Sequence, residues 1–261
     1  MIFINQPYHL VDKRPWALIT RFNLFGLVRG FIIIFLERNW NLFFFEFLFV
    51  SFLAYKWWRD ISCERGYQGY HRDKVREGLY IRIIFFIISE IFFFFSFFWG
   101  YFHRRLAINI ELGFVWPPVG IIRFNPYRIP LLNRIILLSS GVTVTWAHHA
   151  ILDKDFNGTY YGFLLTLLLG FYFTFLQGLE YLERFFCIRD SVYRSIFFLA
   201  TGFHGVHVIV GRLYLLISFL RCIKGKIRSI HHVGAELAIW YWHFVDVVWL
   251  FLYRFVYWWW Y

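Results

Sequence analysis

Cysteine, methionine and charged residues are all scarce in this sequence. Its three cysteines are Cys63, Cys187 and Cys222, and no two of them are spaced as CxxC. An odd number at such wide spacing predicts neither a disulfide framework nor a zinc site. The first 16 residues have no basic stretch followed by an apolar core and a cleavage site, so we expect no cleaved signal or transit peptide. We also find no convincing internal repeat, which disfavours a transporter built from inverted repeats.

Hydrophobic residues, by contrast, make up 60% of the 261 positions, and the mean hydropathy is +0.54. Apolar runs of about 20 residues recur, which is typical of a polytopic membrane protein. Inside lipid such runs must be helical, because only a helix satisfies its own backbone polar groups. We therefore predict an all-α membrane protein, a single domain over 1–261, with seven transmembrane helices. The expected spans are roughly 16–36, 40–58, 79–102, 129–151, 159–183, 192–222 and 233–257.

The net charge of +11 is concentrated between the apolar spans. Such a charge on a soluble protein would suggest a nucleic-acid partner. Here the distribution favours membrane topology instead, and we expect no nucleic acid. The basic residues show a modest excess on the side of the N-terminus, which predicts that this end lies on the matrix or cytoplasmic face.

Several motifs recur in the order of a known family. They are YKWWRD at 55–60, SEIFFF at 89–94, TWAHH at 145–149, ATGFHGVHVI at 200–209 and WYWHFVDVVWLFLY at 240–253. Across about residues 50–257 this series closely resembles subunit III of the haem-copper cytochrome c oxidases, in its mitochondrial type.

The resemblance implies a seven-helix subunit with no catalytic centre, haem or copper of its own. Haem a and copper would belong to subunits I and II of the respiratory complex, accompanied by accessory subunits. Subunit III would support oxygen reduction and proton pumping in subunit I. It would also hold phospholipids in a cleft between its first two helices and the other five, and guide oxygen there. The expected location is the mitochondrial inner membrane.

Two alternatives remain for the function. The first is a subunit III of a quinol oxidase, which differs in the electron donor. The second is a free-standing membrane oxidase that binds metal through histidine boxes. Its candidate ligands would be His148, His149, His204, His207, His231, His232 and His243. The sequence has no HxxHH box, so we expect no metal site in this chain.

A carboxylate lies near the middle of the third span, at Glu90. An ionised carboxylate there is costly unless it is protonated, paired or hydrated. Glu90 is also the position of the family's membrane carboxylate. Two interpretations stay open: an acid that responds to proton movement in the neighbouring subunit, or a neutral structural carboxyl.

The basic face predicts a site for anionic phospholipid, either cardiolipin or phosphatidylglycerol. Cations beside an interfacial tryptophan suit lipid phosphates. The resemblance implies lipid binding near Trp58, Glu64, His71, Arg221, Lys224 and His231. The alternative is an ordinary positively charged loop with no specific ligand.

Other polar residues within the spans predict contacts between helices or with partners. His243 and Asp246 are three apart and share a helix face. With Glu236, they are expected to form interhelical hydrogen bonds. The family pattern lacks several arginines present here, including Arg29, Arg134 and Arg212, where we expect additional subunits or lipids. Gly26 and Gly30, on either side of Arg29, would admit a closely packed helix.

Overall fold

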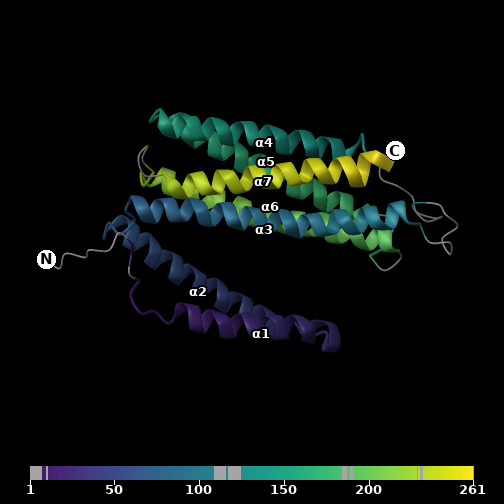
Figure 1. Ribbon diagram of the computed structural model, residues 1–261, viewed down its shortest axis with the longest axis horizontal. Coiled ribbons are helices and arrows are strands. Elements are labelled where there is room, and N and C mark those ends of the chain that lie inside the picture. The colour runs from purple at the N-terminus through teal and green to yellow at the C-terminus, as the bar shows by residue number, and fades with distance from the viewer. Residues whose placement is uncertain are drawn as a thin grey trace. The chain divides into compact units, whose positions relative to one another are not determined.

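The computed structural model describes residues 8–9, 11–108, 116, 125–183, 187–188, 191–227, 229 and 232–260. Within these residues the chain forms seven long helices and no β-strand, which confirms the predicted all-α class (Figure 1). The helices are α1 (Trp16–Glu37), α2 (Asn41–Gly66), α3 (Asp73–Leu106), α4 (Ile129–Leu152), α5 (Phe156–Leu182), α6 (Val192–Ile223) and α7 (Val233–Leu252). The last helix continues through a π-helical turn, Tyr253–Tyr257, and a 3-10 turn, Trp258–Trp260.

Six of the seven helices are long and apolar enough to cross a membrane. The exception is α2, which carries Glu46 in its first half and Lys56, Arg59 and Asp60 in its second. Its apolar part, before Lys56, is shorter than the helix as a whole.

The expected helix ends at residues 58 and 79 are wrong, because both helices are longer. Helix α2 continues to Gly66 and α3 already begins at Asp73. On the exposed first turn of α3, Lys74 pairs with Glu77 at 2.9 Å and Arg76 pairs with Asp73 at 2.6 Å. Pairs at this spacing stabilise a helix outside the apolar region. Hydropathy marks the apolar part of each helix and misses these polar turns.

The chain divides into two compact units, Met1–Ile81 and Arg82–Tyr261, each with its own internal packing. The predicted single domain and the cleft between the first two helices and the other five both concern the relation of these units, and they stay predictions.

In the first unit, α1 and α2 pack closely where α1 has glycine. A Cβ atom at Gly30 would lie 2.9 Å from the backbone nitrogen of Phe43, so only glycine permits this approach. Gly26 likewise faces Glu46 of α2, whose carboxyl carbon would lie 2.7 Å from an added Cβ. The closely packed helix expected at these glycines is α2 of the same chain.

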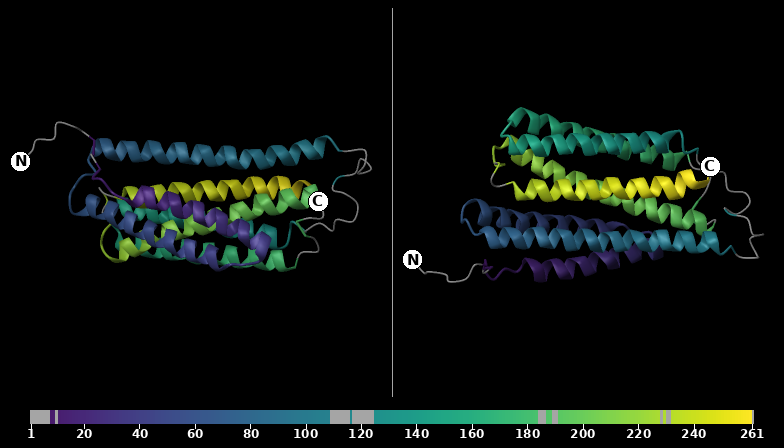
Figure 2. Two further views of the ribbon diagram at one scale, coloured as in Figure 1. Left: turned by 90° about the horizontal axis from the view of Figure 1, so that it is seen from below. Right: turned by 45° about the horizontal axis from the view of Figure 1, so that its top comes forward.

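In the second unit, α4 and α5 make the closest pair, and α7 (yellow in Figure 2) runs along α4 and α6. A Cβ at Gly162 of α5 would lie 2.8 Å from the Ala147 Cβ of α4. Trp242 of α7 is fully buried and sits against Gly170 of α5 and Gly211 of α6. The most buried helix is thus α7, although it holds an aspartate and a histidine.

Aromatic rings join the part of α3 from Arg82 onward to the rest of this unit. Phe93 meets Phe203 of α6 at a centroid distance of 5.1 Å, and Phe102 meets Phe255 at 5.0 Å. The Tyr101 hydroxyl donates to the Phe255 carbonyl at 2.8 Å. Edge-to-face rings of this kind stabilise beyond their buried area. The many phenylalanines therefore serve both lipid-facing and packing positions.

Candidate functional site

Glu90 of α3 pairs with His207 of α6. The distance from Glu90 Oε2 to His207 Nε2 is 2.8 Å. Both side chains are largely buried, with 20% of the glutamate and 12% of the histidine exposed. The rings of Phe93 and Phe94 cover His207. The sequence-predicted carboxylate is therefore paired with a residue 117 positions away.

The second nitrogen of His207 fixes how many protons this pair holds. His207 Nδ1 lies 2.7 Å from the Phe203 carbonyl oxygen, which can only accept. Nδ1 must therefore carry a hydrogen. The contact between Nε2 and Glu90 then needs one proton, which belongs either to a carboxylic acid or to an imidazolium. In both forms the pair is neutral overall, which is the favourable state inside lipid.

His204 is placed differently, although it is only one turn away. It is fully buried and its Nε2 lies 3.2 Å from the Val245 carbonyl oxygen of α7. Rings of Phe173 and Trp249 pack around it. In the part of the chain that the structure describes, no three His, Cys, Asp or Glu side chains gather as metal ligands would.

His243 and Asp246 of α7 face α4. His243 Nε2 lies 3.3 Å from the Thr145 hydroxyl. Asp246 is only 6% exposed, and an added Cβ at Gly141 would lie 2.9 Å from its Oδ2. A cavity of about 520 Å³ opens beside them, lined on α4 by Val142 and Trp146 among others.

At the start of α7, Glu236 contacts His232 at 3.7 Å. The His232 ring lies 6.0 Å from the ring of His148 at the end of α4. His148, His232 and Glu236 thus connect the end of α4 to the start of α7. Glu236 thus lies far along α7 from Asp246, and the three polar residues of α7 form two separate clusters.

The residues predicted to hold lipid fall in both units. In the first unit, Trp58 is 60% exposed, whereas Glu64 is 4% exposed. The Glu64 carboxylate forms ion pairs with Arg14 and, at 3.4 Å, with His9. Arg14 and His9 precede α1, so the segment before α1 folds against the end of α2.

His9, in the segment before α1, also lies near His71. Burial lowers the pKa of His71 below its ordinary value of 6.5, and the neighbouring Arg65 and His9 lower it further. Glu64 opposes them. The His9 ring stacks on Tyr70 at 4.4 Å, and Trp16 Nε1 donates to Asp60 Oδ2 at 2.8 Å. Charged and aromatic side chains therefore contact one another where the segment before α1 meets the end of α2.

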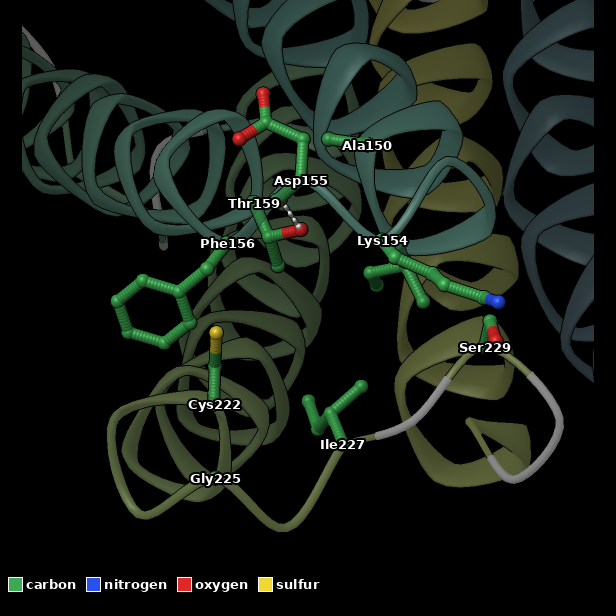
Figure 3. Close-up of a pocket in the computed structure, with 10 residues that line it drawn as sticks. Ala150, Lys154, Asp155, Phe156, Thr159, Cys222, Gly225, Ile227 and Ser229 are labelled. Atoms are coloured by element: carbon green, nitrogen blue, oxygen red, sulfur yellow. Dashed lines mark hydrogen bonds between the residues drawn. The ribbon is translucent and has the colours of Figure 1, made fainter.

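In the second unit, Arg221 and Lys224 stand at the end of α6. His231 lies outside the described residues. The neighbouring turns enclose a cavity of about 510 Å³, lined by Lys154, Thr159, Cys222 and Ser229 among others. Figure 3 shows the Lys154 side chain reaching toward Ser229, while the Asp155 carboxyl points away. The cavity offers a cation and hydroxyl groups beside the basic end of α6.

Comparison with known proteins identifies relatives of this chain. The family described as "Cytochrome c oxidase subunit III" matches residues 6–261. Cytochrome c oxidase subunit 3 of the mosquito Anopheles quadrimaculatus is 52% identical over 255 residues, which cover 98% of this chain and 97% of that protein. The chain belongs to the cytochrome c oxidase subunit III family. Subunit 3 of the tick Rhipicephalus sanguineus is 49% identical, covering 97% and 99%, and that of the salmon Salmo salar 50%, covering 97% of each.

This membership confirms the predicted family and a multi-pass membrane protein of the mitochondrial type. The sequence alone did not reveal the partners of the two buried glutamates. His9 and Arg14 belong to the cluster around Glu64, and His207 pairs with Glu90. A buried carboxylate needs a partner, and this rule could have prompted a search among the histidines and arginines. The rule gives no way to choose between them.

Two of the arginines that depart from the subunit III pattern, Arg134 and Arg212, have contacts within the chain. Arg134 lies over the Tyr253 ring at 5.1 Å and Arg212 over the Phe171 ring at 5.6 Å. Arg212 also donates to the Thr174 hydroxyl at 3.3 Å. Arg29 is exposed on α1. The expectation of extra subunits or lipids at these arginines stays a prediction, and it is strongest at Arg29.

Proposed function

We propose that this chain is the third, non-catalytic core subunit of a cytochrome c oxidase in the mitochondrial inner membrane. It packs beside subunits I and II, which carry haem a and copper, and its N-terminus lies on the matrix side. The carrying observation is the family match over residues 6–261. Identity near one half over nearly the whole length of each relative supports the same role.

The test is purification of the intact complex through a tag on this chain. We expect haem a, copper and cytochrome c oxidation to accompany it. Quinol oxidation in place of cytochrome c oxidation would support the quinol-oxidase alternative. A chain that purifies alone, or with iron bound to itself, would contradict the proposal. Protease accessibility of an N-terminal tag from the matrix side tests the orientation.

We further infer that the basic ends of the helices hold anionic phospholipid, either cardiolipin or phosphatidylglycerol. Arg14 and His9 offset the charge of Glu64, so Glu64 does not oppose a phosphate beside His71. The exposed indole of Trp58 suits the membrane interface. In the second unit, which we consider by itself, Arg221, Lys224 and His231 are the expected cations, and Lys154 lines a cavity near the end of α6. A lipid-filled space of this kind would also give oxygen an apolar route.

Native mass spectrometry of the complex tests this site. The double variant Arg221→Gln and Lys224→Gln should lose retained anionic phospholipid. Lys74→Gln is the control for loss of one positive charge, since Lys74 is exposed and already paired with Glu77. Equal loss in all variants, or no tightly held phospholipid in the parent complex, would favour an ordinary positive loop.

The neutral Glu90–His207 pair is compatible with two roles. It can hold α3 to α6, or it can accept and return a proton as charge moves in the neighbouring subunit. Glu90→Gln separates them, because the amide keeps a donor for His207 Nε2 and removes the exchangeable proton. A proton-linked role predicts normal assembly and an activity that declines over many turnovers. Parent-like activity over sustained turnover would leave only the structural role.

A further inference from the structure

Asp246 has no hydrogen-bond partner among the residues that the structure describes. Both its carboxyl oxygens lack a donor, although the residue is only 6% exposed. A buried carboxyl without a donor is expensive at any depth in a membrane. Yet Asp246 is not sealed in the core, because it lines the cavity of about 520 Å³ between α4 and α7. We call this cavity the α4–α7 groove.

The neighbouring histidine supplies a second acceptor. The Thr145 hydroxyl donates its hydrogen to the Gly141 carbonyl at 2.8 Å. Its contact with His243 Nε2, at 3.3 Å, therefore requires that Nε2 be the donor. In the neutral ring, the other nitrogen, Nδ1, is then an acceptor. An added Cβ at Gly141 would lie 2.9 Å from Asp246 Oδ2 and 3.8 Å from this Nδ1. Two acceptors thus gather at one point of the groove.

The walls around this point are apolar. Leu138 and Val142 of α4 and Val247 and Leu250 of α7 line the groove. Val142 is 70% exposed and Val247 is 48% exposed. The groove is therefore an apolar strip with hydrogen-bond acceptors at its floor, and a ligand that is apolar with at least one donor fits it.

Depth excludes a lipid headgroup as that ligand. Asp246 lies 13 residues after Val233 and 11 before Tyr257, the ends of this span. At about 1.5 Å per residue, it is roughly 16–20 Å from either end. Phosphates sit outside a hydrocarbon core about 30 Å thick, so they do not reach this point. An acyl chain reaches it but has no donor.

We propose that the α4–α7 groove binds a transmembrane helix of a neighbouring oxidase subunit, which presents a hydrogen-bond-donating side chain to Asp246 at mid-membrane. This inference rests on the proposed membership of the complex and names the face that is used. Small Gly141 lets the donor approach, while the apolar walls take the rest of the helix. The donor relieves the two oxygens that this chain leaves without a partner.

A structure of the intact complex tests the contact directly. We expect a donor nitrogen or oxygen of another subunit within about 3.2 Å of an Asp246 oxygen. An acyl chain in the groove, or a helix with no donor at this depth, would overturn the proposal. Neither result would affect the proposed function, which depends on co-purification with haem a and copper.

Variants test how much the hydrogen bond to Asp246 contributes to binding. The measured quantity is retention, the fraction of this chain that stays with the complex after a detergent wash. Asp246→Leu removes the acceptor, and we expect retention to fall about tenfold, since a hydrogen bond between subunits is lost. Asp246→Asn keeps one acceptor and should fall less. Unchanged retention of the leucine variant would contradict the proposal.

Two tryptophan variants keep the proposal testable if the aspartate variants misfold. Val142→Trp fills the groove from an exposed position and leaves the Asp246 side chain unaltered, and it should also reduce retention. Val206→Trp makes the same change on α6, where Val206 is 54% exposed and does not line the groove. Equal retention of the two tryptophan variants would count against a helix in the groove.

Discussion

Glu90 of α3 and His207 of α6 lie 2.8 Å apart and share a single proton. The count follows from the other side of the ring, where Nδ1 donates to the Phe203 carbonyl at 2.7 Å. A neutral pair can remain within a membrane, whereas either residue alone would have to discharge or find another partner. The two residues therefore have to be considered together, in stability as in function.

The first prediction concerns this pair. His207→Leu should lower stability, because it leaves the Glu90 carboxyl partly buried without its partner, at a cost of about 1–3 kcal/mol. Glu90→Gln should change stability by less than about 1 kcal/mol, since the amide still donates to Nε2. Thermal dissociation of the purified complex measures both. The double variant Glu90→Leu with His207→Leu should recover part of the loss, and a strictly additive double variant would refute the coupling.

The second prediction concerns Arg14 and Glu64. Arg14→Leu leaves the Glu64 side chain, which is 6% exposed, with His9 as its remaining ion-pair partner among the residues that the structure describes. We expect a loss of about 2–3 kcal/mol, which frees the segment before α1 from the end of α2. Amide hydrogen exchange over residues 11–15 and 60–66 reports the release. Adding Glu64→Leu should restore protection, and Lys13→Leu serves as a control for loss of one cation. Unaltered exchange in Arg14→Leu would show that the ion pair does not hold the segment.

Sequence patterns located all seven helices but not the full length of α2. Apolar periodicity marks the stretch inside lipid, so the expected helix stopped at Trp58. The real helix continues because Asp60 and Glu64 are one turn apart on one face, where Trp16 and Arg14 meet them. This reason is tertiary, and the local sequence cannot supply it.

The same limit applies to the candidate site. The cost of a carboxylate in lipid singles out Glu90 and Asp246 from their positions in the sequence alone. It cannot say that Glu90 has a histidine partner while Asp246 has none among the described residues. That difference depends on the rotation of α3, α6 and α7 about their axes, which hydrophobicity constrains weakly when nearly every face is apolar.

The third prediction concerns pH. Burial is the main cause of the lowered pKa of His71, and Arg65 and His9 add to it while Glu64 opposes it. Below pH 6.5 the unfolded state therefore binds more protons at this site than the folded state, so stability rises with pH in that window and levels off above it. One proton gives a slope of at most about 1.4 kcal/mol per pH unit, and solvent screening makes it shallower.

Hydrogen exchange at the end of α2 between pH 5 and pH 8, corrected for intrinsic rates, measures this slope. His71→Gln should abolish it, because glutamine does not titrate. Vesicles containing cardiolipin should flatten it as well, since a phosphate beside His71 favours the protonated ring. A slope that survives in His71→Gln would assign the titration to another group.

The fourth prediction concerns the slot that holds Trp242. A Cβ at Gly170 would lie 2.8 Å from the Trp242 ring, and the Trp242 Nε1–H bond to Ser140 at 3.0 Å keeps the ring from moving freely aside. Gly170→Ala should therefore destabilise the chain by about 1–3 kcal/mol through overpacking. Gly178 lies on the same helix with nothing within 4 Å of an added Cβ. Gly178→Ala should be neutral or stabilise by up to about 1 kcal/mol, from helix propensity alone. Thermal dissociation of the complex compares the two. If both alanines behave alike, the slot does not limit packing, and the glycine at 170 needs another explanation.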